Sequence, residues 1–272
     1  MQKLCLVLIG LVSSIPQAFA ADAKAPLRTP PAEVYQWSGL YAGVSLGAGQ
    51  SRFGWYSEPS FVGLVPGGTT NPTFTTTPFS IGLKSTKAIA GLHIGYNWTS
   101  DQLVYGLEAD WQTGSYRTGN FIPLAPPAPN VSAFAINGTN TDLLGAKVND
   151  TGSLSARLGL IALPRLMIYA TGGLALANLT AQGSYVARSG IGTPAATYSQ
   201  TKLMTGWSAG VGVDYALSQN WTLGADYRYA DYGHKSVQLG SLTNNPSGGT
   251  WSINNVIRLT NSATMVRLSY RF

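Results

Sequence analysis

Two carboxylates, Glu108 and Asp110, lie two residues apart in a segment that alternates between apolar and polar side chains. Because side chains at positions i and i+2 of a β-strand point to the same face, both acids would face one side of a sheet. Further charged residues occupy the polar positions of similar segments: Arg157, Asp214, Asp226, Arg228 and Arg267. Charges gathered in this way can form buried ion pairs, select ions along a narrow path, or supply the carboxylates of a catalytic site.

The last segment of the chain shows the alternation most clearly. Its apolar positions are Val266, Leu268, Tyr270 and Phe272, and its polar positions are Arg267, Ser269 and Arg271. A strand with one apolar face, one charged face and an aromatic final residue suits a sheet whose outer surface meets lipid and whose inner surface meets water. The charged residues of the other segments would then face the inside of that sheet.

Eight stretches of the sequence show this period of two. They cover residues 37–50, 86–99, 103–113, 153–163, 166–178, 206–217, 221–230 and 262–272. The connections between them are short at 100–102, 164–165 and 218–220, and long at 51–85, 114–152, 179–205 and 231–261. Short turns that alternate with long loops are typical of outer-membrane barrels. We therefore predict an all-β fold, an eight-stranded antiparallel transmembrane up-and-down β-barrel with long extracellular loops.

The aromatic residues on the apolar faces sort by their place along the strands. Those near the short turns are Trp98, Tyr105, Tyr215, Trp221, Tyr270 and Phe272. Those near the long connections are Trp111, Trp207 and Tyr229. Since amphipathic rings prefer the two membrane interfaces, this distribution predicts two aromatic belts around the barrel.

Composition supports a membrane barrel and argues against other classes. Only 10% of the 272 residues are charged, 32 are glycine, and the mean hydropathy is +0.06, whereas about a quarter of the residues in soluble proteins are charged. After residue 20 no apolar run approaches the roughly 20 residues that a transmembrane helix needs. The net charge of +6 comes from scattered cations, which argues against nucleic-acid binding.

The start of the chain is typical of a secretion signal. Lys3 precedes an apolar stretch at 4–12, and the small residues Ala18 and Ala20 form a cleavage site. The predicted organisation is a removed signal peptide at 1–20, a disordered periplasmic leader at 21–36 and the barrel at 37–272. Cys5, the one cysteine, lies in the signal, so the exported chain would hold neither a disulfide nor a Cys-ligated metal.

An eight-stranded barrel has an interior just wide enough for side chains to fill it. We therefore expect the seven charged residues named above to pair with one another into a plug across the lumen. A narrow ion-selective path and catalytic carboxylates remain the alternatives. His93 would face the lumen and His234 would lie at a loop edge, with no cysteine near them, so we predict no metal site and no cofactor.

Five ordered motifs resemble the alphaproteobacterial outer-membrane immunogenic protein family. Residues 37–43, WSGLYAG, are similar to that family's opening W-[ST]-G-[FL]-Y-x-G, and further similar motifs lie at 91–98, 169–175, 206–215 and 220–229. The resemblance covers essentially the whole chain after the signal. It implies a barrel of the OmpA and OmpX type without a peptidoglycan-binding domain, in a family of surface antigens of which some are porin-like and some bind hemin. No hemin-binding motif is evident in this sequence.

Two classes of function follow. The first is a non-enzymatic surface protein that contributes to envelope integrity and surface presentation, with a narrow porin-like path for small solutes as a variant. Its rim cations would meet lipid phosphates: Lys84, Lys87, Arg117, Lys147 and Lys202. The alternatives are a lipid-A-modifying enzyme and a hemin-binding surface receptor. The pattern places no histidine beside a serine on the lipid face, which disfavours the enzyme.

We expect a monomer in the outer membrane of a Gram-negative cell, reached after Sec-type export. Its expected partners are outer-membrane lipid, lipopolysaccharide and the barrel-assembly machinery, with no nucleic acid among them. The assembly machinery would recognise the outward positions of the terminal strand, Val266, Leu268, Tyr270 and Phe272.

Overall fold

The computed structural model describes residues 35–62, 74–75, 79–121, 143–185, 196–242 and 250–272. All of them belong to one unit, Val34–Phe272. Their strands are β1 (Gly39–Val62), β2 (Phe74–Thr75), β3 (Phe79–Ser100), β4 (Leu103–Phe121), β5 (Leu143–Leu163), β6 (Leu166–Tyr185), β7 (Ala196–Ala216), β8 (Trp221–Leu242) and β9 (Thr250–Arg271). In these stretches there is no helix of the length and apolarity required to cross a membrane. The predicted cleavage site at Ala18 and Ala20 lies outside the described residues and stays a prediction.

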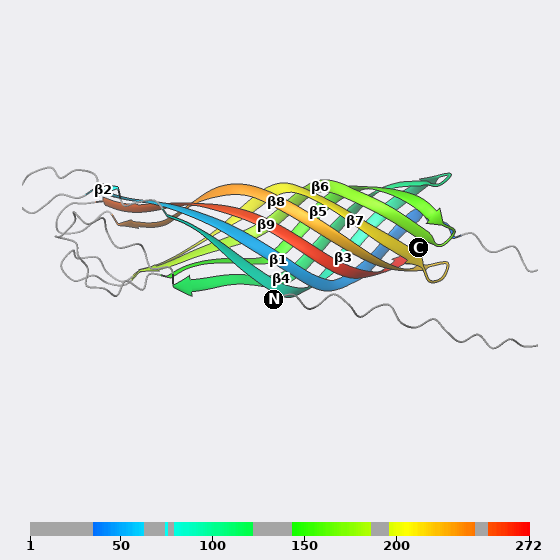
Figure 1. The fold of residues 1–272 in the computed structure, drawn as a ribbon, viewed down its shortest axis with the longest axis horizontal. Helices are drawn as coiled ribbons and strands as arrows, with labels where there is room; N and C mark the ends of the chain where they lie inside the picture. The colour runs from blue at the N-terminus through cyan, green and yellow to red at the C-terminus, as the bar shows by residue number, and fades with distance from the viewer. Residues whose placement is uncertain (1–34, 63–73, 76–78, 122–142, 186–195, 243–249) are drawn as a thin grey trace, which may run out of the picture. The chain divides into compact units, whose positions relative to one another are not determined.

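The strands form one antiparallel sheet that closes on itself (Figure 1). From β3 onward each strand pairs with the next along the chain, and β9 returns to pair with β1. The two-residue β2 pairs with β1 at Ser60 and Phe61, just beyond Ser57, the last residue that β1 pairs with β3. The prediction of an eight-stranded up-and-down barrel is confirmed, with β2 as a short addition.

The register of the barrel follows from a line of paired residues that starts at Ala42 in β1. The line passes through Ile94, Ala109, Leu154, Leu174, Trp207, Asp231 and Thr260 and returns to β1 at Arg52. It comes back ten residues further along β1, from 42 to 52, which is a shear of ten. Closing a ring with such a stagger requires the strands to tilt by roughly 35–45° and leaves an interior that side chains can fill.

The half of the barrel next to the short turns has an apolar outer face. Leu158, for example, points outward and is 56% exposed. Near the short turns the rings of Trp98 and Tyr105 stack with centroids 5.8 Å apart, and near the other end Trp207 and Tyr229 lie 5.7 Å apart. The two aromatic belts predicted from the sequence are therefore present, and they bound the lipid-facing band.

The strands continue well beyond the outer aromatic belt, so the predicted bounds of the long connections were wrong. We expected long loops over 51–85, 114–152, 179–205 and 231–261, but every described residue in these ranges belongs to a strand. The reason is that the apolar and polar residues exchange faces of the sheet there. In β1 the side chains of Phe53 and Trp55 point inward and are each 1% exposed, while Arg52 points outward into solvent. Here the apolar face is the inner one.

Beyond the outer belt the ring separates into two sheets. In the described strands, pairing between β3 and β4 ends at Ala90 and Thr113, and pairing between β7 and β8 ends at Trp207 and Asp231. The strands β4-β5-β6-β7 and β8-β9-β1-β3 stay paired among themselves. Together they enclose an apolar cluster that includes Phe53, Trp55, Tyr116, Val148, Leu179, Met204, Tyr232, Ile257 and Leu259. We call this two-sheet region the outer head.

The opposite mouth of the barrel, beside the short turns, is filled by residues that precede β1. Tyr35 and Trp37 are 5% and 4% exposed, and their rings meet edge to face with centroids 4.6 Å apart. The Tyr35 hydroxyl lies 2.9 Å from the Thr222 hydroxyl, and the Arg271 guanidinium lies 5.3 Å from the centre of the Tyr35 ring. Tyr35, which falls at the end of the predicted leader, thus packs inside the barrel.

Candidate functional site

Glu108 of β4 is the centre of a charge network in the lumen. It is 1% exposed, and it accepts hydrogen bonds from both terminal nitrogens of Arg267, at 3.0 and 2.5 Å. Arg228 donates to it at 3.3 Å, and the Tyr41 hydroxyl donates at 2.8 Å. A charge that has been removed from water is tolerated only when several such partners replace its hydration. Three side chains from three other strands, β1, β8 and β9, are therefore held together by one carboxylate.

Arg157 of β5 connects Glu108 with Asp214 of β7. Its guanidinium forms an ion pair with Asp214 and lies 3.8 Å from Glu108. The same group stands 3.6 Å from the centre of the Tyr169 ring, and one of its nitrogens donates to the Tyr41 hydroxyl at 3.4 Å. A planar guanidinium with an aromatic face beneath it and carboxylates at its edge is stabilised by cation–π attraction and by ion pairing together.

Arg228 of β8 forms the second branch of the network. One terminal nitrogen pairs with Asp110 and donates to the Ser153 hydroxyl at 3.1 Å, and the other lies 3.9 Å from Asp226. Asp226 is the least well paired acid, because its Oδ1 has no hydrogen-bond partner among the described atoms. With four carboxylates and three guanidinium groups, this described network contains one more acid than base.

The structure thus places all seven charged residues of the sequence prediction in one connected cluster. Arg271 lies apart from it, at the short-turn mouth, where it donates to the carbonyl oxygens of Ser38 and Gln219 at 3.3 and 2.6 Å. His93 faces the lumen, with its Nε2 2.8 Å from the Ser269 hydroxyl. His234, expected at a loop edge, is an exposed residue of β8. The described residues contain no group of three or more His, Cys, Asp or Glu that could hold a metal.

Two tyrosines support the network without having been assigned to it from the sequence. Tyr41 is paired with Gly95, and a Cβ on that glycine would collide with the Tyr41 ring. Tyr169 is paired with Gly212, where the same collision would occur. A large inward residue in a narrow barrel needs a glycine beside it. An inward tyrosine next to an inward glycine is therefore the signal that would have found both.

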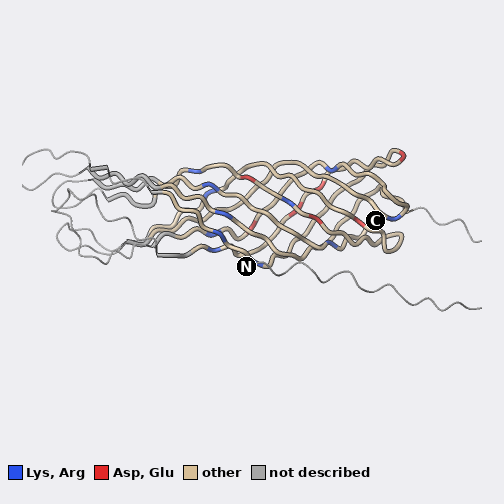
Figure 2. Tube along the Cα trace, viewed as in Figure 1, with Lys and Arg blue, Asp and Glu red and all other residues tan. Residues whose placement is uncertain are grey.

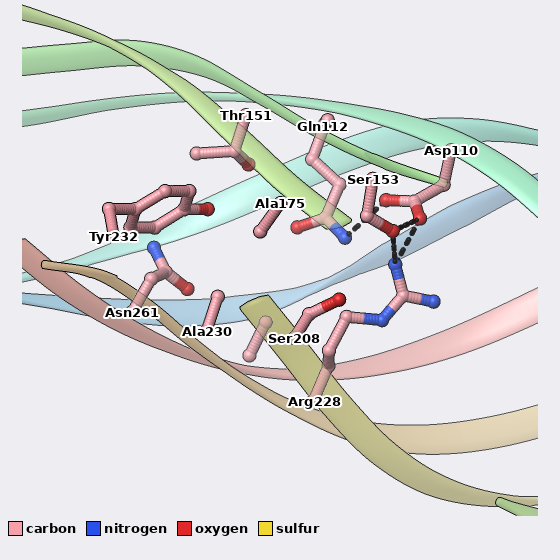
Figure 3. A pocket seen from close by; sticks show the side chains of 12 residues that line it. Asp110, Gln112, Thr151, Ser153, Ala175, Ser208, Arg228, Ala230, Tyr232 and Asn261 are labelled. Atoms are coloured by element: carbon pink, nitrogen blue, oxygen red, sulfur yellow. Dashed lines mark hydrogen bonds and ion pairs between the residues drawn. The ribbon is translucent and has the colours of Figure 1, made fainter. Parts of the chain in front are cut away.

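A small cavity adjoins the network (Figure 3). Its volume is about 20 Å³, and its lining includes Asp110, Arg228, Ser208 and Tyr232. A space of this size has room for about one water molecule. The ion pair between Asp110 and Arg228 stands at its edge, together with Ser153 (Figure 3). The cavity is therefore far smaller than a site for an organic ligand.

A second charged feature lies where the outer head begins, and Figure 2 shows Lys and Arg gathered there, at the end of the barrel away from the short turns. Its residues are Arg52, Lys84, Lys87, Arg117, Lys147, Lys202, Lys235 and Arg258. From the rise per residue and the strand tilt, these eight lie within roughly 8 Å of one level, about 10 Å beyond the outer aromatic belt. We call them the cationic girdle. Asp150 and Asp231 lie close to the same level, and Asp231 pairs with Arg258 at 2.7 Å.

Comparison with known proteins identifies the family. Residues 11–272 match the family model of the outer membrane protein beta-barrel domain. The chain belongs to this family. The 31 kDa outer-membrane immunogenic protein of Brucella melitensis is 31% identical, over 81% of this chain and 83% of its own length. The 25 kDa outer-membrane immunogenic protein of Brucella abortus is 29% identical, over 89% and 90%.

The family and these relatives locate the protein in the outer membrane, as the sequence predicted. A 22 kDa outer membrane protein of Rhizobium leguminosarum is also similar, at 27% identity over 54% of each chain. Among solved structures, the attachment invasion locus protein Ail of Yersinia pestis has a TM-score of 0.38 and 14% identity, covering 87% of this chain and 100% of that one. OprG of Pseudomonas aeruginosa has a TM-score of 0.39 and 12% identity, covering 83% and 96%.

Proposed function

We propose that this chain is a non-enzymatic outer-membrane surface protein, whose plugged barrel contributes to envelope integrity and carries the outer head for presentation at the cell surface. The observation that carries the proposal is Glu108, which is bound at once by Arg228 and Arg267 and lies within 4 Å of Arg157. These side chains come from four strands and meet across the lumen. A lumen filled in this way supports a mechanical and barrier role rather than free diffusion of solutes.

Conductance in planar bilayers tests whether the lumen is plugged. We expect the parent protein to give no steady current. Arg157→Ala should increase leakage, because it removes the group that joins Asp214 to Glu108 and opens a gap beside Tyr169. Arg117→Ala, which removes an arginine from the outer surface, is the matched control and should stay silent. A steady current through the parent protein would support the porin-like alternative instead.

The enzymatic alternative requires a nucleophile that lipid can reach. In the described residues, His93 and Ser269 form a serine–histidine pair, but His93 is 5% exposed and both side chains face the lumen. A lipid on the outer wall has no path to that pair. Incubating the purified protein with lipid A and measuring released acyl chains tests this point, and measurable turnover would refute the non-enzymatic assignment.

Surface presentation is supported by the relatives. Those of Brucella are named outer-membrane immunogenic proteins, and a part exposed on the cell surface is the part that antibodies would reach first. We extend this property to the present chain, with the outer head as the part that antibodies would meet. The hemin-receptor alternative gains no support from the cavity that the described residues form beside the lumen network, because its volume of about 20 Å³ is too small for such a ligand. Antibodies raised against the whole protein should label intact cells, and labelling only after lysis would contradict the proposal.

The assembly machinery is proposed as a partner of β9. Its outward residues Val266, Leu268 and Tyr270, and Phe272 directly after it, are all on the lipid-facing side. Phe272 is 69% exposed, and its ring meets that of Tyr270 edge to face at 5.2 Å. We expect Phe272→Ser to lower the amount of protein assembled in cells while leaving the refolding of purified protein in detergent unchanged. Equal assembly in cells would count against this role.

A further inference from the structure

The cationic girdle contains two pairs of like charges that the register places directly opposite each other. Arg52 of β1 pairs with Lys84 of β3, and Arg117 of β4 pairs with Lys147 of β5. The Cα atoms of such partners are about 4.5–5.5 Å apart. Like charges directly opposite one another destabilise a sheet. Two such pairs on neighbouring strands indicate that an anion outside the protein offsets the repulsion.

These two pairs flank the seam along which β3 and β4 separate. We call this line, which begins beyond Ala90 and Thr113, the first seam. Lys87 of β3 lies beside it. Its partner in β1, Gly49, is buried, so Lys87 has an inward register position, yet its side chain is exposed. Because β4 no longer continues the sheet at this level, the ammonium group of Lys87 reaches solvent at the seam.

The two arginines are held in the same way. Nε of Arg52 donates to the side chain of Gln50 at 3.1 Å, and Nε of Arg117 donates to the hydroxyl of Ser115 at 3.0 Å. In both cases the partner is two residues earlier on the same outer face. This contact uses Nε and keeps the two terminal nitrogens of each guanidinium for an outside ligand. Two such nitrogens match the paired oxygens of a phosphate.

The charges at the first seam differ from those on the other side of the girdle. There Asp231 neutralises Arg258 at 2.7 Å. Among the side chains that the structure describes, no carboxylate lies within 4 Å of Arg52, Lys84, Lys87, Arg117 or Lys147. Asp150 of β5 lies close to this level but forms no ion pair with any of the five among the described side chains. The excess of positive charge is therefore larger on β1, β3, β4 and β5, with five girdle cations to one acid, than on β7, β8 and β9, with three girdle cations to one acid.

The position of these cations selects the kind of anion. They lie about 10 Å beyond the outer aromatic belt, which is the level of lipid headgroups rather than of acyl chains. Because β3 and β4 are no longer paired at this level, the centres of the two pairs are at least two strand spacings apart, which is about 10 Å or more. A glycolipid headgroup that carries two phosphates would place one phosphate on each pair.

We propose that Arg52, Lys84, Lys87, Arg117 and Lys147 form a binding site for a doubly phosphorylated glycolipid of the outer leaflet. The inference rests on the proposed function in one respect, namely that the barrel spans the outer membrane with its head outward. Arg52 and Lys84 take one phosphate, Arg117 and Lys147 take the other, and Lys87 contributes positive charge between them.

Native mass spectrometry of the detergent-solubilised protein, with a chelator present to remove bridging metal ions, tests the site. The probes are lipid A with two phosphates, the same lipid A after removal of its phosphates, and inorganic pyrophosphate. The test variant is the double substitution Arg52→Gln and Arg117→Gln. The control is Lys202→Gln and Lys235→Gln, which removes two girdle cations from β7 and β8 at the other seam.

We expect the test variant to bind phosphorylated lipid A about tenfold or more weakly, as for two basic groups lost beside an anionic lipid headgroup, and the control to change by less than about twofold. Dephosphorylated lipid A should bind the parent no better than it binds the test variant. Equal weakening in both variants would overturn the site. Displacement of the lipid by an equal concentration of pyrophosphate would overturn the assignment to a lipid.

Thermal unfolding provides a second readout that does not depend on the binding assay. Without lipid A, Arg52→Gln should leave the melting temperature unchanged or raise it slightly, because repulsion from Lys84 is removed. With lipid A present, the same variant should melt below the parent. A variant that melts below the parent in both conditions would overturn the role of the repulsion. The conductance test remains separate, since a silent parent with no lipid selectivity contradicts only this site.

Discussion

Glu108 and Arg267 are separated by 159 residues, yet they form a two-point ion pair with nitrogen–oxygen distances of 3.0 and 2.5 Å. They belong to β4 and β9, which are not paired with each other. The contact therefore crosses the lumen and depends on closure of the ring. The ion pair of Glu108 with Arg267 therefore forms only in the assembled barrel, because its partners come together only after the last strand joins the first.

Neutralising Glu108 should destabilise the barrel strongly. Among the described side chains, Glu108→Gln leaves the buried Arg267 without a carboxylate within 4 Å, and an unpaired buried charge typically costs about 3–5 kcal/mol. Urea unfolding in lipid vesicles, followed by tryptophan fluorescence, measures this change. Asp226→Asn is the matched control, because Asp226 is the surplus acid and lies 3.9 Å from its nearest guanidinium. We expect it to change the free energy of unfolding by no more than about 1 kcal/mol, the usual net contribution of one hydrogen bond, and equal losses in both variants would contradict the network as described.

A methyl group at Gly224 should disturb the same network from the wall. A Cβ on this inward glycine of β8 would collide with Oδ1 of Asp214 and lie 3.0 Å from the carbonyl oxygen of Val213. We expect Gly224→Ala to lower the free energy of unfolding by about 1–3 kcal/mol, the usual cost of overpacking. Gly82→Ala is the control, since nothing lies within 4 Å of the added atom there. It should be neutral or stabilising by up to about 1 kcal/mol, so only the substitution at Gly224 should lower the free energy of unfolding.

The sequence predicted the lipid-facing wall well because one rule applies along its whole height. Residues such as Leu158, Val211 and Leu268 alternate with polar residues, and the structure places all three on the outer face. The sequence pattern did not predict the outer head, because there the apolar residues face inward and the polar residues face outward. Phe53 and Trp55 also alternate with polar residues, but the apolar members turn inward. A prediction that assigns every apolar position to the outer face therefore applies only to the part of the barrel that contacts lipid.

The lumen network shows a similar limit. Parity alone indicates that Arg157 and Asp214 face inward, since each residue follows the period of its own strand. Parity does not indicate that the two form a pair, because β5 and β7 are separated by β6. That choice depends on the shear of ten, which sets the relative heights of strands that do not touch. The short turns constrain neighbouring strands, whereas heights across the barrel follow only from the closed ring.

The outer head should lose order separately from the membrane part when its core is weakened. Trp55 is 1% exposed, and its Nε1 donates to the side chain of Asn255 at 2.8 Å. Trp55→Ala should cost the head about 3–5 kcal/mol. Hydrogen exchange should become faster in residues 51–62 of β1 and 250–259 of β9, while residues 39–48 of β1 stay protected. Faster exchange along the whole of β1 would contradict the independence of the head.

Placing an arginine on the outer face at two different heights of the barrel tests where the lipid-facing band ends and the outer head begins. Leu158 and Leu203 are outward leucines of nearly equal exposure, 56% and 55%, but Leu158 lies within the lipid-facing band and Leu203 lies in the outer head. Leu158→Arg should lower the free energy of unfolding in vesicles by about 2–4 kcal/mol, whereas Leu203→Arg should change it by about 0–1 kcal/mol. In detergent-free buffer with added amphipol the two losses should converge, because no bilayer then distinguishes the heights. If Leu203→Arg were as costly as Leu158→Arg in vesicles, the membrane would extend over the outer head, and the cationic girdle would lie too deep to contact lipid phosphates.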